Sequence, residues 1–394
     1  FLTRYEDLLA SNNNVWLDAE PYAEAKILLD SFQIWVKELE ADPAAEQIEK
    51  GLARARQLIK DAEAEAIVVR PFIVFVAGKG LKGDEGEAKR AELAKRGQRY
   101  AKALEVFYAK FVEKFGQPLG LEEIPAKKVF YHWVYEDKES FDQGALMGDG
   151  FDVSGDVYGY FAPKSRWAYA LHSNDEQQAL LLNGDICHEA LHQLHWYHSK
   201  DPDDKWENHF DRWQALWFNE GWAEYLGGGV QLDPSSGNAE WTGKPRRRIQ
   251  HLKLLRDTGM PRIPLRELVQ QDSFEALARW IRDVWAGMLR QDEEVPDTAL
   301  ALMNDPNQGA LHVKTFYAQA WFLAYFMNEY DDGKLRQKYL DLVLTALRGK
   351  LKPEAYRKNP TVKEHWPSAY EAFVEIMGIK GDDDWKKLQR QYDG

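Results

Sequence analysis

The feature that most constrains this chain is a pair of histidines four residues apart, His188 and His192, with Glu189 directly after the first. On a helix, positions i and i+4 lie about 40° apart around the axis and one turn along it, so both imidazoles point toward one place. Two imidazoles in this arrangement are what a zinc site needs. Glu189 would lie beside the metal, where a carboxylate can take a proton from a metal-activated water. The motif therefore predicts a helix with two metal ligands and a general base.

The residues around this motif suit a buried helix. Its uncharged neighbours are Cys187, Ala190, Leu191 and Leu194. Cys187 is the only cysteine, which excludes an internal disulfide framework and a cysteine-based zinc site, and we interpret it as a packing residue. Because the chain has ten histidines, the alternative is a chance match on a histidine-bearing helix that binds no metal.

A third ligand is needed to complete the site, and the segment 217–225, WFNEGWAEY, offers one. Residues 213–226 have helical spacing, and Glu220 and Glu224 are four apart, so their carboxylates share one face. One carboxylate could bind the metal while the other accepts the free N–H of a ligand histidine and fixes the orientation of its ring. The alternative is a pair of solvated carboxylates on a surface helix.

The two motifs together, His-Glu-x-x-His and Asn-Glu-Gly-x-Ala-Glu, resemble those of the glutamate zincins (gluzincins, clan MA), which include thermolysin-like peptidases and M1-type aminopeptidases. They are most similar to the bacterial peptidase-MA-like domains. The resemblance implies one zinc ion per chain, held by His188, His192 and Glu220, with Glu189 as general base. It implies that Glu224 orients a ligand histidine, as the carboxylate at this position does in thermolysin-like members. The implied activity is that of a zinc metallopeptidase acting on a peptide or protein.

Two residues compete with Glu220 as the third ligand. The spacer of 27 residues between His192 and Glu220 is longer than in the familiar families, and Asp211 falls at their shorter spacing. Asp211 lacks the Asn-Glu-Gly-x-Ala-Glu context, so we prefer Glu220. His198 fits the metzincin spacing, but that pattern needs glycine where His195 stands, because the chain turns sharply there. His195 itself either lines the cleft or is a polar residue at the helix end.

The segment 316–326, FYAQAWFLAYF, resembles a Tyr-Ala-Gln-Ser-Trp element of peptidase-MA-like domains, with Ala320 in place of the serine. It also resembles the helix of M1-type enzymes whose first-turn tyrosine contacts the tetrahedral intermediate. The resemblance implies that Tyr317 donates a hydrogen bond to the oxyanion formed during hydrolysis. The alternative is a tyrosine on an aromatic core helix. His312 is a weaker candidate for the same donor.

A β-hairpin is expected over Val157–Leu171, with its turn at Pro163-Lys164-Ser165. In zincins an edge strand binds the extended substrate through main-chain hydrogen bonds, and we assign this role to Arg166–Leu171. The alternative is an ordinary strand of the sheet. M1-type aminopeptidases capture the substrate amine with a Gly-x-Met-Glu-Asn element. The sequence has no such element, which favours an endopeptidase.

The remaining pattern predicts an α+β fold that is predominantly helical. We expect a zincin-like catalytic domain over residues 121–394, with a small mixed sheet and two motif-bearing helices, preceded by a helical N-terminal region over residues 1–120. Helices are expected over Tyr22–Leu39, Ile48–Ile67 and Glu87–Phe115, strands over Ala66–Val76 and Lys128–Tyr135, and helix almost throughout after Asn174.

Charge and hydropathy exclude several classes of partner. The net charge of −13 argues against nucleic-acid binding, which needs clustered Lys and Arg, and we interpret the one dense basic run, Arg246-Arg247-Arg248, as a solvated helix face. The longest apolar stretch, Ala66–Ala77, is too short and too charged for a membrane span. Because the chain begins at Phe1 rather than Met, we lean toward a mature exported chain, periplasmic or secreted, and the compartment stays open.

Three alternatives to a gluzincin peptidase stay open. One is a non-catalytic zincin-like module in which the cleft only binds peptides, another is a metzincin-like site with His198 as third ligand, and the last is a metal-dependent hydrolase of another bond. The presence of Glu189 beside a full ligand set favours the peptidase, because a site that only binds has no evident need for a base.

Overall fold

The computed structural model describes residues 43–58, 63–78, 83–149, 158–162, 165–172, 176–199, 215–233, 238–260, 262–271, 277, 308–348 and 369–394. The chain divides into two compact units, Phe1–Glu49 and Lys50–Gly394, and the second contains the sheet and both motifs. The helix expected over Tyr22–Leu39 lies outside the described residues.

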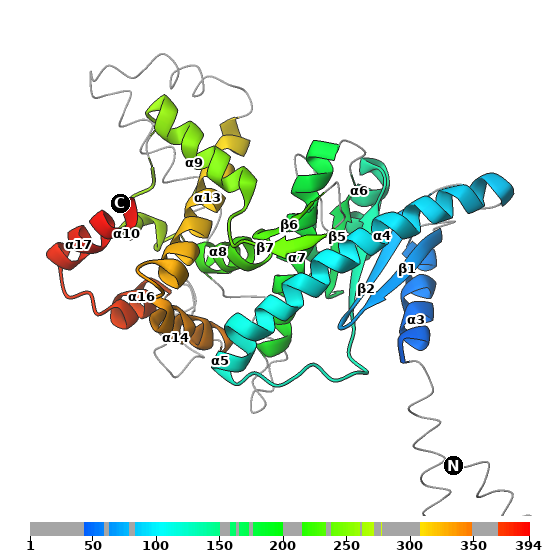
Figure 1. Ribbon diagram of the computed structural model, residues 1–394, viewed down its shortest axis with the longest axis horizontal. Coiled ribbons are helices and arrows are strands. Elements are labelled where there is room, and N and C mark those ends of the chain that lie inside the picture. The colour runs from blue at the N-terminus through cyan, green and yellow to red at the C-terminus, as the bar shows by residue number, and fades with distance from the viewer. Residues whose placement is uncertain are drawn as a thin grey trace, which may run out of the picture. The chain divides into compact units, whose positions relative to one another are not determined.

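A mixed sheet of five strands is the scaffold of the second unit (Figure 1). In spatial order its strands are β1 (Glu63–Val69), β2 (Phe72–Gly78), β3 (Phe130–Tyr135), β5 (Trp167–Leu171) and β4 (Gly159–Ala162). The β2–β3 and β3–β5 pairs are parallel, and the two outer pairs are antiparallel. The run of apolar residues in β2 is buried, as is usual for a strand covered on both faces.

Two expectations about strands are wrong. The single strand expected over Ala66–Val76 is the hairpin β1–β2, which turns at Arg70 and Pro71, because Pro71 has no N–H to continue a ladder. The segment Arg166–Leu171, expected at the edge of the sheet, contains β5, which lies between β3 and β4. The residues of β5 from Trp167 to Ala170 are all buried, as an inner strand requires, and β4 is the edge strand. The hairpin itself is confirmed, with β4 antiparallel to β5.

The boundary expected at residue 120 does not separate two units. Strand β2, before it, pairs in parallel with β3, after it, so both belong to one sheet. Helix α4 (Gly83–Phe111) packs on β1 and β2 and also on α7 (Glu176–His198), and Figure 1 shows it lying across these strands. The division falls instead between Glu49 and Lys50.

The long helix expected over Glu87–Phe115 is confirmed as α4, which continues as a π-helical turn over Val112–Gly116 and a short α5 (Gln117–Leu119). It ends at Gly120, whose φ of 62° is the left-handed conformation that glycine adopts without strain. The helix expected over Ile48–Ile67 is only partly correct. Helix α3 spans Pro43–Leu58, and the residues from Glu63 to Ile67 belong to β1, where they pair with β2.

Helices dominate after Asn174, as expected. They are α7, α8 (Leu216–Leu226), α9 (Arg246–Thr258), α10 (Leu265–Leu268), α13 (Gln308–Glu329), α14 (Arg336–Leu347), α16 (Ala369–Met377) and α17 (Asp382–Asp393). Two further elements, helix α6 (Lys138–Asp149) and the two-stranded sheet of β6 (Val230–Leu232) and β7 (Ala239–Trp241), were not anticipated. The structure thus confirms a mostly helical α+β fold with a small mixed sheet. None of the described helices has both the length and the hydrophobicity to cross a bilayer.

The packing of four helices positions the two motifs. Helix α7 packs on β4 and β5, α8 packs between α7 and α13, and α9 packs on α13. Figure 1 shows α8 between α7 and α13, with α9 beside α13. The first motif therefore faces the second across the α7–α8 interface.

Candidate metal centre

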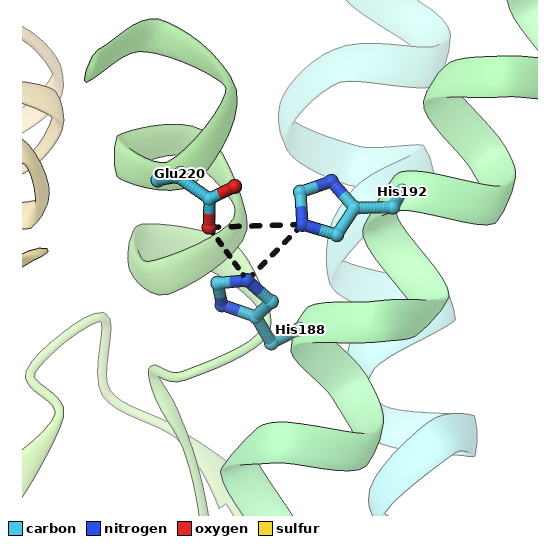
Figure 2. A group of neighbouring side chains, drawn as sticks. All are labelled: His188, His192 and Glu220. Atoms are coloured by element: carbon cyan, nitrogen blue, oxygen red, sulfur yellow. Dashed lines mark hydrogen bonds and ion pairs between the residues drawn. The ribbon is translucent and has the colours of Figure 1, made fainter. Parts of the chain in front are cut away.

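Helix α7 carries His188 and His192 one turn apart, with both side chains buried. Their rings point to the same place, because the two Nε2 atoms lie 3.1 Å apart (Figure 2). This is the arrangement that the four-residue spacing predicts for a helix.

Helix α8 brings Glu220 to the two histidines. Its Oε2 lies 3.1 Å from Nε2 of His188 and 3.9 Å from Nε2 of His192. Figure 2 shows the three side chains meeting between α7 and α8. Their donor atoms all lie within 4.8 Å of one another, so this buried group could hold a metal ion. The rival ligand Asp211 lies outside the described residues.

Glycines allow α8 to approach its neighbours this closely. A Cβ atom on Gly227 would lie 2.4 Å from the backbone of Cys187 and His188, and one on Gly221 would lie 2.5 Å from the carbonyl oxygen of Ala320 in α13. Both obstacles are backbone atoms that cannot swing aside, so only glycine fits. Helix α8 is therefore held tightly on one side against α7 and on the other against α13.

Glu224 lies behind His188, on the side opposite Glu220. Its Oε1 is 3.3 Å from Nδ1 of His188, while Nε2 of the same ring faces Glu220. The Glu224 side chain has no solvent exposure, and its Oε1 also accepts hydrogen bonds from Arg247, at 3.0 Å, and from Arg248. A carboxylate at this place is able to orient the imidazole ring.

The expectation of a solvated face at Arg246–Arg248 is wrong for two of the three residues. Arg246 is exposed, but Arg248 is buried and Arg247 is half-buried. The charge of Glu224 explains this placement, because a buried carboxylate needs cations beside it. Arg247 also pairs with Asp185 of α7.

The electrostatics of the cluster favour a positive charge between its donors. Burial lowers the pKa of a histidine, but the carboxylates of Glu220 and Glu224 raise the pKa of His188 to about 10. Burial dominates at His192 and lowers its pKa to about 4. Burial opposes ionisation of Glu220, yet His188 and His192 hold its pKa below the ordinary value. The pKa of Glu224 is well below its usual range, because Arg248 and Arg247 outweigh its burial.

Glu189 is buried beside the cluster. Burial raises its pKa to about 8, although His188 nearby acts in the opposite direction. A carboxyl group with such a pKa can accept and return a proton near neutral pH. A Cβ atom on Gly159 would lie 3.4 Å from Oε1 of Glu189, so the edge strand β4 passes directly against this carboxylate.

Tyr317 of α13 borders the same site. Its ring centroid lies 6.2 Å from that of His188, and the guanidinium of Arg248 lies 4.8 Å from the centroid of the Tyr317 ring. Burial, together with Glu220, raises its pKa well above the ordinary value, so the hydroxyl keeps its proton. The side chain of His312 lies outside the described residues.

His198 and His195 do not join the cluster. Helix α7 runs on to His198, so this residue points away from the side of His192, and its ring stacks on Phe111 with centroids 5.7 Å apart. His195 lies in the last turn of α7, as expected for a polar residue at the helix end. It is buried, lies 5.1 Å from the ring of Trp222 and shares a hydrogen bond with Asn219 at 3.2 Å. The geometry thus favours Glu220 over His198 as the third member of the cluster.

The donor set is chemically suited to a divalent transition metal. Two imidazole nitrogens and one carboxylate oxygen are a set used by catalytic zinc sites, and tetrahedral donors bonded at about 2 Å lie about 3.3 Å apart. The distances of 3.1, 3.1 and 3.9 Å between the present donors are close to this value.

No model of a protein family matches the chain, and no curated protein matches it.

Proposed function

We propose that this chain is a zinc-dependent peptidase of the gluzincin type, and that it acts as an endopeptidase. The observation that carries the proposal is the convergence of His188, His192 and Glu220 within 4.8 Å, with Glu189 buried next to them. A bound metal and an adjacent base with a pKa near neutrality are the two parts that metal-assisted hydrolysis requires. The zincin-like fold is part of the same proposal.

Each residue then has a distinct task. His188, His192 and Glu220 would hold the zinc ion, which would supply Lewis acidity and activate a water. Glu189 accepts the proton of this water on its carboxylate and delivers it to the leaving amine, so one group serves as base and then as acid. Tyr317 keeps its proton and donates its O–H to the oxyanion. Glu224 holds the ring of His188 in place through Nδ1.

The edge strand β4 is the proposed site for the substrate backbone. An extended peptide can add to the edge of a sheet through main-chain hydrogen bonds. Strand β4 lies at that edge and passes against Glu189, so a peptide beside it would reach the base. We therefore assign to β4 the substrate-binding role that was expected for the segment containing β5. The lack of an amine-capturing Gly-x-Met-Glu-Asn element supports cleavage of internal bonds.

The test compares the wild type with Glu189→Gln, using metal analysis and mass-spectrometric profiling of a peptide library. We expect about one zinc per chain in both proteins. We expect internal cleavage by the wild type and a rate about 10²- to 10⁴-fold lower in Glu189→Gln. Glu113→Gln, the same change at an exposed helix position, is the control and should behave as the wild type.

Two outcomes would contradict the proposal. A Glu189→Gln protein that cleaves at the wild-type rate would remove the assigned base. A zinc-loaded wild type that cleaves no peptide would favour a non-catalytic peptide-binding module instead.

A further inference from the structure

The first turn of α9 places one buried arginine against Glu224, behind the metal ligands. Arg248 is 8% exposed, and its Nη2 donates to Oε1 of Glu224. Arg247 donates to the same oxygen at 3.0 Å, but it also pairs with Asp185 and remains half-buried. Glu224 is thus held by two cations from one helix turn, through one of its two oxygens.

The oxygen that these arginines hold is the one that faces the metal ligand. Oε1 of Glu224 lies 3.3 Å from Nδ1 of His188. A carboxylate with no solvent exposure is stable only where charged partners or hydrogen bonds surround it. Without the arginines, no cation would hold the Glu224 carboxylate at this distance from His188. The ring of His188 would then lose its fixed orientation.

Arg248 also contacts the other proposed functional group. Its guanidinium lies 4.8 Å from the ring centroid of Tyr317, a distance at which a cation and an aromatic face attract each other. The extended guanidinium lets Arg248 donate to the carboxylate through Nη2 while its central carbon lies over the ring. Arg248 therefore touches both the residue behind the metal ligand and the proposed oxyanion donor.

We propose that Arg248 is a positioning residue that fixes Glu224 against His188 and Tyr317 beside the metal site, so that it sets both metal affinity and turnover. The proposal rests on the proposed function. It assigns two effects to one side chain, and the two are separable, because the contact with Glu224 acts on metal binding and the contact with Tyr317 acts on the reaction.

The test uses Arg248→Gln, Arg248→Lys and the control Arg246→Gln in the full chain. Arg246 is the exposed neighbour, and its Nε donates to Gln231 at 3.1 Å. Zinc affinity is measured by competition with a chromophoric chelator, and kcat and KM are measured on the best library peptide. Circular dichroism and thermal unfolding without metal report whether each variant is folded.

In Arg248→Gln we expect zinc affinity to fall about 10- to 100-fold, as for other changes behind metal ligands. We expect kcat to fall further even at saturating zinc, with little change in KM. Arg248→Lys keeps the charge beside Glu224 and should restore most of the zinc affinity, but not kcat, because the compact ammonium that pairs with Glu224 does not extend over the Tyr317 ring as the guanidinium does. Arg246→Gln should match the wild type in both measurements.

A folded Arg248→Gln with wild-type zinc affinity and kcat would overturn the inference. If that variant does not fold, Arg248→Lys decides, because wild-type kcat in it would overturn the role at Tyr317. A wild type that binds zinc but cleaves nothing would contradict the proposed function alone, since the zinc affinities of the variants still test the contact with Glu224.

Discussion

Helix α8 borders two polar clusters, and each contains a glutamate whose negative charge is balanced in a different way. One is the metal cluster, His188, His192 and Glu220, which lies between α7 and α8. The other is the lysine cluster, Lys114, Tyr225 and Glu329, which joins the π-helical turn to α8 and α13. Glu224 and Tyr225 are adjacent in the sequence, but Glu224 lies beside the metal cluster and Tyr225 belongs to the lysine cluster.

The lysine cluster already contains its cation. Nζ of Lys114 lies 2.6 Å from Oε1 of Glu329 and 3.0 Å from the hydroxyl of Tyr225, which itself donates to Glu329. The ammonium also lies 4.5 Å from the ring centroid of Trp241. Every charge in this cluster therefore has its partner, and we interpret it as a structural ion pair.

The metal cluster differs in where its positive charge lies. Its three donors face one another, and the described cations nearest to them, Arg247 and Arg248, lie behind Glu224 instead of between the donors. Two imidazole nitrogens and a carboxylate oxygen that converge, with no described lysine or arginine between them, suit a metal ion. The comparison teaches that a buried carboxylate indicates a metal site only where no lysine or arginine of the protein lies among the donor atoms.

The largest effect expected is from Glu220→Gln, compared with Glu329→Gln. The first change replaces the anionic oxygen of a proposed ligand by a neutral amide oxygen, and it should weaken zinc binding by more than the 10- to 100-fold typical of changes behind a ligand, so by more than about 100-fold. The second makes the same chemical change in the lysine cluster and should leave zinc affinity unchanged. Chelator competition measures both, and equal losses in the two variants would break the distinction between the clusters.

A smaller effect is expected from Gly221→Ala, which acts where both clusters meet. The new Cβ would lie 2.5 Å from the carbonyl oxygen of Ala320, so α8 and α13 must separate. Overpacking of this kind costs about 1–3 kcal/mol of unfolding free energy, which urea denaturation measures. We also expect a modest loss of zinc affinity, below that of Glu220→Gln, because Glu220 is the adjacent residue.

Gly116→Ala is the matched control for this change. Gly116 is also buried and helical, but a Cβ atom there would meet nothing closer than 3.7 Å. The alanine should be neutral or stabilising by up to about 1 kcal/mol. If Gly221→Ala is as stable as Gly116→Ala, the close contact between α8 and α13 is not what positions Glu220.

The sequence predicted the parts of the site that depend on local spacing. His188 and His192 are one helical turn apart, and so are Glu220 and Glu224. The relative direction of the side chains in each pair therefore follows from helix geometry alone. The fold class followed in the same way, from the helical periodicity and the short β-branched runs.

The rest depends on contacts between distant parts of the chain. Arg248 follows Glu224 by 24 residues, and Lys114 precedes Glu329 by 215, so no local pattern links them. Nothing in the residues of the basic run at Arg246–Arg248 distinguishes a solvated arginine from one that neutralises a buried carboxylate. The edge of the sheet was misplaced for a similar reason, because strand order is set by pairing between strands and not by the strand's own residues.

The smallest effect expected is from Lys114→Met, which removes the cation of the lysine cluster. Because Glu329 is 34% exposed and can be hydrated, the loss of unfolding free energy at neutral pH should be only about 1 kcal/mol. Lys102→Met, which breaks an exposed ion pair with Glu105, is the control and should cost less. Zinc affinity should not change in either variant, which would sharpen the contrast with the metal cluster.

Acid should remove the contribution that the ion pair between Lys114 and Glu329 makes to the free energy of unfolding. Burial alone would raise the pKa of Glu329, but Lys114 and Tyr225 lower it below the ordinary value. A group with a lowered pKa stabilises the fold above its unfolded pKa, about 4.3 for Glu, and this stability is lost as the pH falls through the folded value. Urea unfolding at pH 7 and pH 3.5 should therefore show a larger acid loss in the wild type than in Lys114→Met. Parallel pH profiles for the two proteins would mean that the ion pair contributes nothing and that the lysine cluster is held together by packing alone.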